Sequence, residues 1–178
     1  GIQGAHAFEV AFDGVRVPAA NRLGAEGTGF KTAMKVLDNS RLDVAATALG
    51  IAEAALADAT RWMRERQIGG EPIASKQGLQ WMLADMKLRL EASWALTLQA
   101  LALRQAGQPF TLQSAMAKLH ASEMVGFVTD AALQIHGGYG YTREMPLERY
   151  VRDARILRIY EGSSEVQRNI IARMVLAD

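Results

Sequence analysis

The residues best suited to chemistry lie near the end of the chain, where Glu161 stands between Tyr160 and Gly162. Ser163 or Ser164 follows, and serine is a preferred helix N-cap because its hydroxyl accepts a hydrogen bond from the first turn. Unpaired N–H groups and a partial positive charge at a helix N-terminus stabilise an anion or a developing oxyanion. Gly162 lets the backbone approach a ligand closely. Glu161 is therefore a candidate general base; the alternative is a loop acid ahead of a capped helix.

A glycine cluster follows Gln134 and contains Gly137, Gly138 and Gly140. It is not the dinucleotide fingerprint, which needs a strand before the glycines and a helix opening from them, whereas a helical pattern precedes these. Two interpretations stay open. Gly137 could end the helix in the left-handed conformation, or the glycines could let a flat or phosphate-bearing ligand lie against bare backbone.

Arginines form the third candidate group. Arg66 ends a long helical pattern, where its charge would interact with the helix dipole, but arginine also clamps pyrophosphate, and both readings stay open. Four more arginines follow between residues 149 and 158, a run typical of a solvated face with ion pairs to Glu144, Glu148 and Asp153. Phosphate binding is an alternative for this run. The formal net charge of +1 gives no reason to expect nucleic acid.

Composition narrows the remaining classes. With 178 residues, nearly half of them apolar, the chain can bury a substantial core in one or two domains. It has no cysteine and only three scattered histidines, so a metal site is not predicted. No apolar run is long enough to cross a bilayer, so no membrane span is predicted.

Two kinds of element must position these residues. Phe8, Val10 and Phe12 alternate with polar or small residues, and the pattern stops at Pro18, which predicts strands in residues 1–27. So few strands cannot form a stable sheet, so they should belong to a truncated β-domain or pack on the helices. Because the chain opens at Gly1 without a methionine, we expect it to be a fragment.

Residues 28–178 are predicted to be an all-α domain. Helical patterns cover residues 29–67, 75–106, 111–136, 146–159 and 163–176, with residues 38–40 as a break or new cap in the first. The second carries two apolar stripes, as expected inside a bundle or at a subunit interface. The predicted fold class is mainly α, an up-and-down helical bundle preceded by a short β segment.

Together these segments resemble the C-terminal half of the acyl-CoA dehydrogenases, in order and over essentially the whole chain. The resemblance is carried by Leu133-Gln134-Ile135-His136-Gly137-Gly138-Tyr139-Gly140-Tyr141, by Arg152-Asp153-Ala154, and by Ile159-Tyr160-Glu161-Gly162-Ser163-Ser164-Glu165-Val166-Gln167-Arg168. The first 27 residues look like the last strands of the family's middle β-domain.

The resemblance implies an FAD enzyme that removes two hydrogens from an acyl-CoA thioester and leaves the 2,3-enoyl-CoA. It makes Glu161 the base for the α-proton, while hydride leaves the β-carbon for the flavin. Hydrogen bonds to the thioester oxygen would come from the flavin ribityl hydroxyl and the backbone N–H of Glu161. Ser40 stands where some members carry the base, so Glu161 is the only carboxylate that matches a family base.

The same resemblance assigns the remaining site residues. Substrate contacts would come from Asp38, Asn39, Ser40, Arg41 and Gly162. FAD contacts, in part to the cofactor of a neighbouring subunit, would come from Arg66, Gln77, Gln134, Ile135, His136, Gly137, Gly138, Ser163, Ser164, Glu165 and Gln167. Gly69 departs from the family pattern, replacing an aromatic residue, as do Lys76, in place of an aromatic, and Ser163, in place of threonine.

The expected partners are an acyl-CoA substrate, an electron-transfer flavoprotein and further copies of the chain, as a dimer or tetramer. The expected location is the cytoplasm in a bacterium or the mitochondrial matrix in a eukaryote. We expect the 178 residues alone to fold and associate but to show little or no activity. The alternatives are an acyl-CoA oxidase, or a helical interaction domain of a relative that has lost dehydrogenation.

Overall fold

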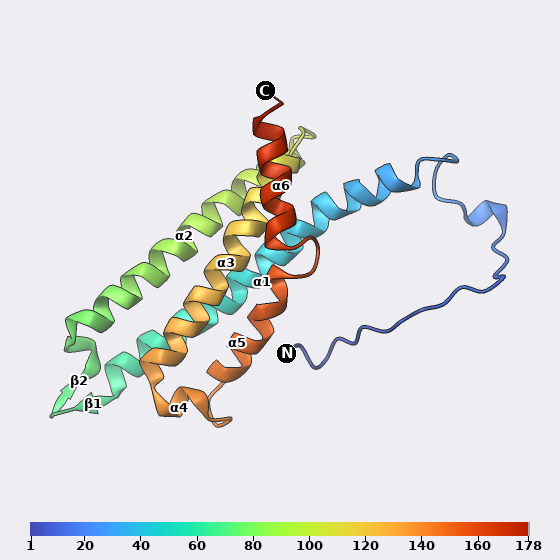
Figure 1. The fold of residues 1–178 in the computed structure, drawn as a ribbon. Helices are drawn as coiled ribbons and strands as arrows, with labels where there is room; N and C mark the ends of the chain where they lie inside the picture. The colour runs from blue at the N-terminus through green and yellow to red at the C-terminus, as the bar shows by residue number, and fades with distance from the viewer. Residues whose placement is uncertain (178) are drawn as a thin grey trace.

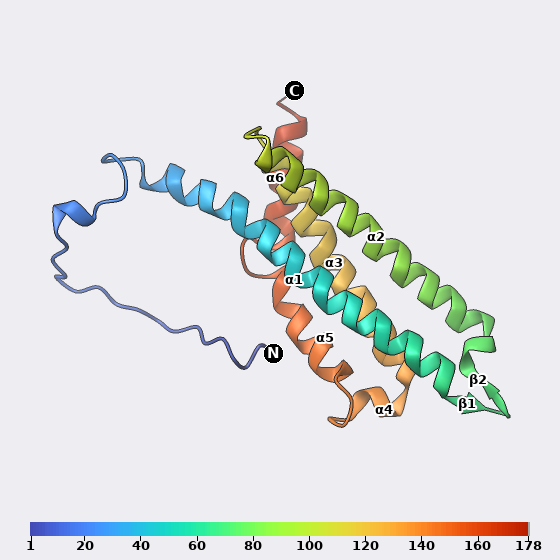
Figure 2. The same ribbon diagram turned by 180° about the vertical axis from the view of Figure 1, so that it is seen from behind.

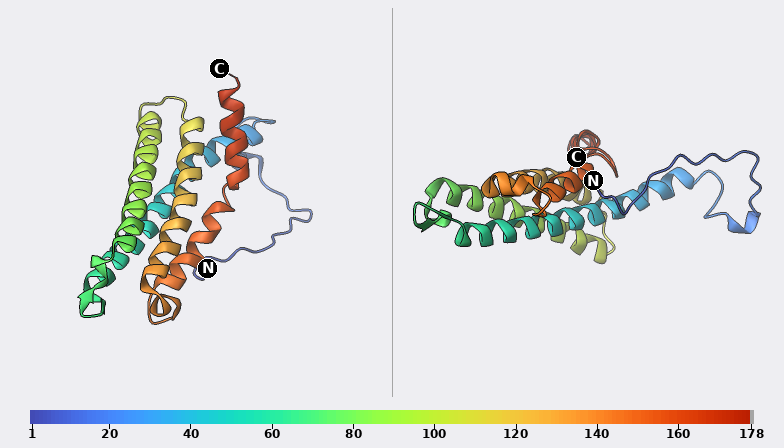
Figure 3. Two further views of the ribbon diagram at one scale, coloured as in Figure 1. Left: turned by 60° about the vertical axis from the view of Figure 1, so that its left-hand side comes forward. Right: turned by 90° about the horizontal axis from the view of Figure 1, so that it is seen from below.

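Three long antiparallel helices form the body of the molecule in a computed structural model that describes residues 1–177 (Figure 1). They are α1 (Gly29–Glu65), α2 (Gln77–Gln105) and α3 (Thr111–His136). Two shorter helices, α5 (Leu147–Arg155) and α6 (Ser164–Val175), lie end to end along the opposite side of α3 from α2 (Figures 1 and 3). The predicted class, a mainly helical up-and-down bundle, is confirmed.

Helix α3 is the centre of the bundle, since α1, α2, α5 and α6 all pack on it. The seam between α1 and α3 is lined by small side chains, and the α1 members are fully buried: Ala45, Ala48, Ala52, Ala55 and Ala59. Alanine has no side-chain rotamers to lose and lets helix backbones approach closely. The alanine-rich face of α1 is therefore the surface that packs on α3. The reverse view shows the two helices lying against each other (Figure 2).

The α1–α2 connection is a small hairpin of β1 (Gln67–Ile68) and β2 (Glu71–Pro72), which pair antiparallel. Its two-residue turn is Gly69-Gly70, with φ of +67° and +85°. A two-residue hairpin of this kind needs positive φ at both positions, which glycine adopts without strain. A 3-10 turn, Ile73–Ser75, then leads into α2.

The C-terminal third differs from the sequence prediction in one place. The glycine segment, which lies outside the predicted helical patterns, forms the short helix α4 (Gly138–Tyr141), separated from the end of α3 at His136 by Gly137 alone. Gly137 has φ of +60° and its N–H bonds back to the carbonyls of Leu133 and Gln134, so the predicted glycine stop of α3 is confirmed. After α5, the 3-10 turn Ile156–Arg158 leads to the Glu161 loop.

The strands predicted before residue 28 do not form. Residues 1–28 begin against α5, where the N–H of Ile2 donates to Asp153 Oδ1, and then run as an extended loop that leaves the bundle and returns at α1 (Figures 1 and 2), with a single 3-10 turn at Ala19–Asn21. The alternating side chains are exposed, Phe8 by 81% and Phe12 by 82%. An isolated strand has no partner for its backbone groups. These apolar side chains do not pack on the helices, and the assignment of residues 1–27 to a β-domain stays a prediction.

Two further expectations are corrected. Helix α1 passes without a break through Asp38 and Ser40, because packing on α3 outweighs the local turn preference of residues 38–40. In the run of arginines between residues 149 and 158, Arg158 pairs with Glu123 of α3 instead of with its sequence neighbours. None of the helices within residues 1–177 is long and apolar enough to span a membrane.

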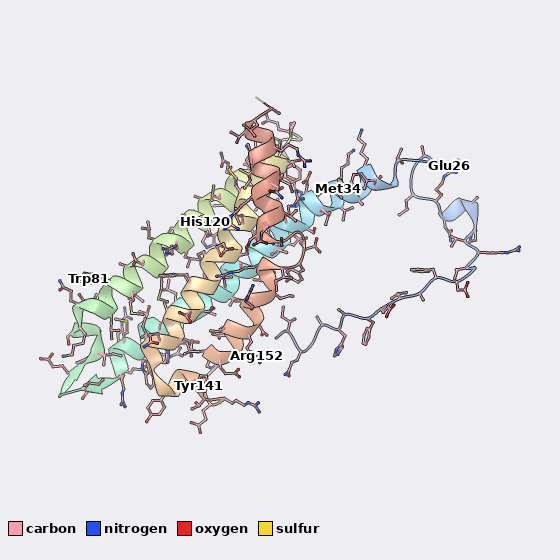
Figure 4. The ribbon with its side chains drawn as sticks, viewed as in Figure 1. Glu26, Met34, Trp81, His120, Tyr141 and Arg152 are labelled. Carbon is pink, nitrogen blue, oxygen red and sulfur yellow. The ribbon has the colours of Figure 1, made fainter. Side chains whose placement is uncertain are left out.

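Only one apolar stripe of α2 is covered. Met86 and Leu90 are buried against the bundle, whereas Trp81 is 63% and Leu88 68% exposed on the other side. Figure 4 labels Trp81 near the start of α2. Within residues 1–177 the second stripe is therefore not in the interior of the bundle, and its place at a subunit interface stays a prediction.

Candidate active site

Glu161 lies in a strained turn between Ile156–Arg158 and α6. Its φ is +54°, and Gly162 follows at +87°. The left-handed conformation costs a residue other than glycine roughly 1–2 kcal/mol, and such strain persists only where the surroundings hold it. Ser163 then caps α6, accepting a hydrogen bond from the N–H of Val166 at 3.4 Å. The predicted turn and cap ahead of a helix are both confirmed.

The Glu161 carboxylate points at helix α1. Ser40 Oγ donates a hydrogen bond to Glu161 Oε2 at 2.7 Å, and Glu161 is half-buried. Among residues 1–177, Ser40 is the only hydrogen-bond donor to this carboxylate, so one oxygen is held while Oε1 is free to accept a proton. The two residues are 121 positions apart in sequence. A fixed carboxylate with one available oxygen is the arrangement that a general base requires.

Two buried side chains hold the backbone of the same turn. Gln167 Nε2 donates to the Glu161 carbonyl at 3.1 Å and to the Gly162 carbonyl at 3.0 Å. Lys118 Nζ, from α3, donates to the Gly162 carbonyl at 2.6 Å. Both side chains are fully buried. The predicted cofactor residue Gln167 therefore faces the turn, and its contact with FAD stays a prediction.

Sequence analysis missed Lys118 as a site residue. The available signal was a lysine on the inward face of α3, in line with the buried Ala121, Ser122 and Val125 at three, four and seven residues' distance. A lysine is almost never fully buried unless it is paired. Burial lowers the pKa of Lys118, and Arg41 adds to this effect, while the carboxylate of Glu161 opposes it.

The predicted substrate residues on α1 divide into two groups. Ser40 meets Glu161, whereas Asp38 is engaged by Arg41 Nη1 at 2.5 Å and by Thr111 Oγ1 at 2.7 Å. Asn39 Nδ2 bonds back to the Lys35 carbonyl. Asp38, Arg41 and Thr111 line an open groove of about 320 Å³ together with Met34, Ile170, Arg173 and Met174.

The residues of the first turn of α6 also differ in what their side chains face. The side chain of Ser164 is buried and donates to Glu123 Oε1 at 2.7 Å, so it faces α3. Glu165 is exposed, and its pKa is lowered by a hydrogen bond from Ser163 and by one from its own backbone N–H. Ser163 and Glu165 are thus the members of this turn that remain accessible to a ligand.

A second group of predicted residues meets at the opposite end of α3. Trp62 stacks on His136 with ring centroids 5.0 Å apart, and the Arg66 guanidinium lies 5.5 Å from the centre of the Tyr139 ring. His136 is buried, and its Nδ1 bonds to the Ala132 carbonyl at 2.7 Å, so that nitrogen carries the hydrogen.

These residues border an open groove of about 460 Å³ that also includes Ile68, Ile73, Ile135, Gly137, Gly138, Thr142 and Glu144. A Cβ built on Gly137 or Gly138 would meet no atom within 4 Å, so the backbone there is bare. The groove thus combines aromatic faces, open backbone and one guanidinium, a set that suits a flat, phosphate-bearing group. Gln134, and Gln77 at the start of α2, are exposed beside this end, and Ile135 is buried.

The two groups do not meet within one chain. Lys118 touches the Glu161 turn, and His136 lies 18 residues further along the same helix. At 1.5 Å per residue the two ends are about 27 Å apart. The Glu161 turn and the Trp62–Tyr139 groove are therefore separate sites on each copy of the chain.

Comparison with known proteins identifies the family of the chain. The family model described as the acyl-CoA dehydrogenase C-terminal domain matches residues 27–176. The acryloyl-CoA reductase (NADH) of Anaerotignum propionicum is 53% identical over 176 residues, which are 99% of this chain and 45% of that protein. Solved structures with the same fold include butyryl-CoA dehydrogenase from Megasphaera elsdenii, with a TM-score of 0.91, 49% identity, and coverage of 93% of this chain and 43% of that one.

A chain in a structure of the electron transferring flavoprotein of Acidaminococcus fermentans is similar at a TM-score of 0.92 and 48% identity, covering 94% of this chain and 44% of that chain. The present chain thus spans less than half the length of the relatives that it matches. Because the family model covers residues 27–176 and the relatives align over nearly the whole chain, the protein belongs to the acyl-CoA dehydrogenase family and contains its C-terminal domain.

Proposed function

We propose that the protein dehydrogenates a short-chain acyl-CoA thioester to the 2,3-enoyl-CoA, with Glu161 as the base that removes the α-proton. The observation that carries this proposal is the fixed carboxylate of Glu161, anchored by Ser40 at 2.7 Å and set in a left-handed turn before a capped helix. A base that removes a proton from one particular C–H bond acts faster when its carboxylate is held in a fixed orientation. The short-chain substrate class follows the butyryl-CoA dehydrogenase likeness.

The acidity of the substrate explains why a carboxylate suffices. The α-C–H bond of a thioester is a weak acid, and it becomes removable when the carbonyl oxygen is held by hydrogen bonds as enolate character grows. The backbone N–H of Glu161 is the donor that this chain offers to that oxygen. One residue then supplies both the base and part of the oxyanion site.

FAD is the proposed cofactor, and when bound it supplies the acceptor for the hydride that leaves the β-carbon. Ser163 and Glu165 would hold it beside Glu161, where both are accessible. Arg66, Gly137 and Gly138 would hold the FAD of a second copy, because they lie about 27 Å from Glu161 in their own chain. The groove at these residues has the aromatic faces and the guanidinium that this role requires.

Assembly follows from the same division of the site. A complete FAD site would need two copies of the chain, and the exposed stripe of α2, including Trp81 and Leu88, offers an apolar surface for this contact. The proposed assembly is a dimer or tetramer. The proposed electron acceptor is an electron-transfer flavoprotein, by analogy with the Acidaminococcus structure. Residues 1–178 alone are expected to show little dehydrogenation.

A second candidate is the reverse reaction, reduction of a 2,3-enoyl-CoA. The 53% identical relative named acryloyl-CoA reductase (NADH) favours it. Glu161 would then return the proton to the α-carbon, since a base and its conjugate acid serve the two directions of one step. Assays of a saturated acyl-CoA with an electron acceptor, and of the enoyl-CoA with NADH, separate the two directions.

Glu161→Gln in the complete protein tests the role of the base. Glutamine keeps the shape and a hydrogen bond to Ser40 but cannot accept the proton, so we expect a loss of turnover of about 10²-fold or more. Flavin content and assembly size should be unchanged. Glu91→Gln, an exposed carboxylate on α2, is the matched control. Activity of Glu161→Gln within about threefold of the control would remove Glu161 from the mechanism, and retention of flavin without any substrate turnover in the wild type would favour an interaction domain.

A further inference from the structure

The buried lysine of α3 has no part in the chemistry described above, yet its only hydrogen-bond acceptor among residues 1–177 belongs to the Glu161 turn. Lys118 is fully buried, and its Nζ donates to the Gly162 carbonyl at 2.6 Å. Gln167, also fully buried, donates to the same carbonyl at 3.0 Å and to that of Glu161 at 3.1 Å. Three donor contacts therefore converge on two consecutive carbonyl groups.

These carbonyls belong to two consecutive residues with positive φ. Glu161, at +54°, gains nothing intrinsic from this conformation, because only glycine adopts it freely. Something outside the turn must keep it there. The hydrogen bonds from Lys118 and Gln167 fix the orientation of both peptide planes, and a bond to an ammonium group is among the stronger ones.

The conformation of Glu161 matters because two functional groups share its backbone. The N–H that would meet the thioester oxygen and the side chain that would meet the α-proton diverge from one Cα, so the φ and ψ of Glu161 set the angle between them. A rotation of the turn would move the carboxylate off Ser40, which holds it at 2.7 Å, or turn the N–H away. Misplacement by about 1 Å is enough to cost roughly 10²-fold in rate.

We propose that Lys118 is a positioning residue: together with Gln167 it clamps the Gly162 carbonyl and thereby holds Glu161 in the left-handed conformation in which its carboxylate and N–H act on one substrate. This inference rests on the proposed function for its catalytic part. The structural part, that the clamp holds the turn, is independent of any activity. Neighbouring charges fit the assignment, since the carboxylates of Glu161, Glu123 and Glu165 all favour a charged Lys118.

Charge alone does not explain the placement of Lys118. Burial and the guanidinium of Arg41 both disfavour its ammonium form. A lysine that only balanced Glu161 could do so from the surface, where water lowers the cost of its charge. Because Lys118 is buried directly under the turn, its ammonium group reaches the Gly162 carbonyl, which also accepts from Gln167.

Lys118→Met is the first variant, because methionine keeps the unbranched shape and removes the donor and the charge; replacing a buried charge with an apolar isostere is often tolerated in folding. Gln167→Met is the second and removes the other two contacts. Lys35→Met is the matched control, as Lys35 is exposed on α1. All three are made in the complete protein.

Amide hydrogen exchange measures the structural part without substrate. In Lys118→Met and Gln167→Met, we expect the amides of residues 160–168 to exchange about 10- to 100-fold faster, corresponding to the loss of one charge-assisted hydrogen bond in the first variant and of two neutral ones in the second. Amides of α2 should exchange as in the control. Unchanged protection of residues 160–168 in both variants would overturn the clamp, whether or not the protein is a dehydrogenase.

Steady-state kinetics and exchange of the substrate α-hydrogen with D₂O measure the catalytic part. We expect both variants to lose about 10- to 100-fold in kcat and in α-hydrogen exchange, with KM and flavin content within about twofold of Lys35→Met. If the variants also lose flavin and thermal stability and their KM rises, Lys118 only stabilises the fold, and the positioning role is refuted. If the wild type itself exchanges no α-hydrogen, the proposed function fails, while amide exchange still decides the clamp.

Discussion

Replacing Gly162 with alanine tests how tightly the Glu161 turn is built. Gly162 has φ of +87°, and an added Cβ would lie 2.5 Å from Gln167 Nε2. The left-handed conformation alone costs alanine about 1–2 kcal/mol. The amide of Gln167 must also withdraw, and its two hydrogen bonds to the turn are worth about 1–3 kcal/mol together. We expect Gly162→Ala to lower the free energy of unfolding by about 2–5 kcal/mol.

Gly107→Ala separates the two contributions. Gly107 has φ of +67° at the end of α2, but an added Cβ there meets no atom within 4 Å. Its substitution should cost only the conformational part, about 1–2 kcal/mol. The free energies come from urea unfolding of the complete protein, with equal slopes required for the comparison.

A double-mutant cycle completes the test. When Gln167→Ala has already removed the amide, alanine at position 162 has less to displace, so the two costs should sum to more than the cost of the double variant. The expected coupling is about 1–3 kcal/mol, well above the roughly 0.5 kcal/mol found for independent sites. Additive costs, or a Gly162→Ala variant no less stable than Gly107→Ala, would refute the account of the turn.

Two further predictions concern pH and assembly. His120 lies between α2 and α3, hydrogen-bonded to Ser93 at 2.7 Å, and burial, with a smaller effect of Arg89, lowers its pKa below 6.5 (His120 is labelled in Figure 4). The unfolded chain then binds the proton first, so stability is full above pH of about 6.5 and falls as the pH drops through the folded pKa. His120→Gln should flatten this fall, measured as urea midpoints at pH 7 and pH 5; an equal fall in both proteins would contradict it. Leu88→Asp, in the exposed stripe of α2, should reduce the assembly size seen by light scattering, and an unchanged size would place the contact elsewhere.

Helix periodicity and punctuation were enough to predict the bundle. The predicted third helix agrees with α3 at both ends, and Gly137 and Ser163 stop and start helices where predicted. Glycine ends a helix through its own backbone conformation, and serine starts one through its own hydroxyl. Both effects are local, so they can be predicted from the sequence. The prediction failed where tertiary contacts outweigh local preference: α1 continues through residues 38–40 because its buried face packs on α3.

Residue types and a family resemblance also identified Glu161 as the base candidate, together with the α1 segment that contains Ser40. What they did not reveal is the contact between the two, which joins positions 121 residues apart. The same holds for Lys118, 44 residues from Gly162. No local pattern encodes a pairing across such separations, since it depends on how α1 and α3 pack around the turn.

The sequence by itself thus determined the long helices and α6, the residues that stop or start α3 and α6, and which carboxylate has a glycine and a helix start beside it. Only the tertiary structure decided that Glu161 faces Ser40, that the Gln167 amide donates to the turn, and that a buried lysine supports the turn. The physical reason is the sequence separation of the interacting residues. Backbone conformation and capping depend on residues a few positions apart, whereas the orientation of a side chain in a site depends on the packing of helices that are distant in sequence.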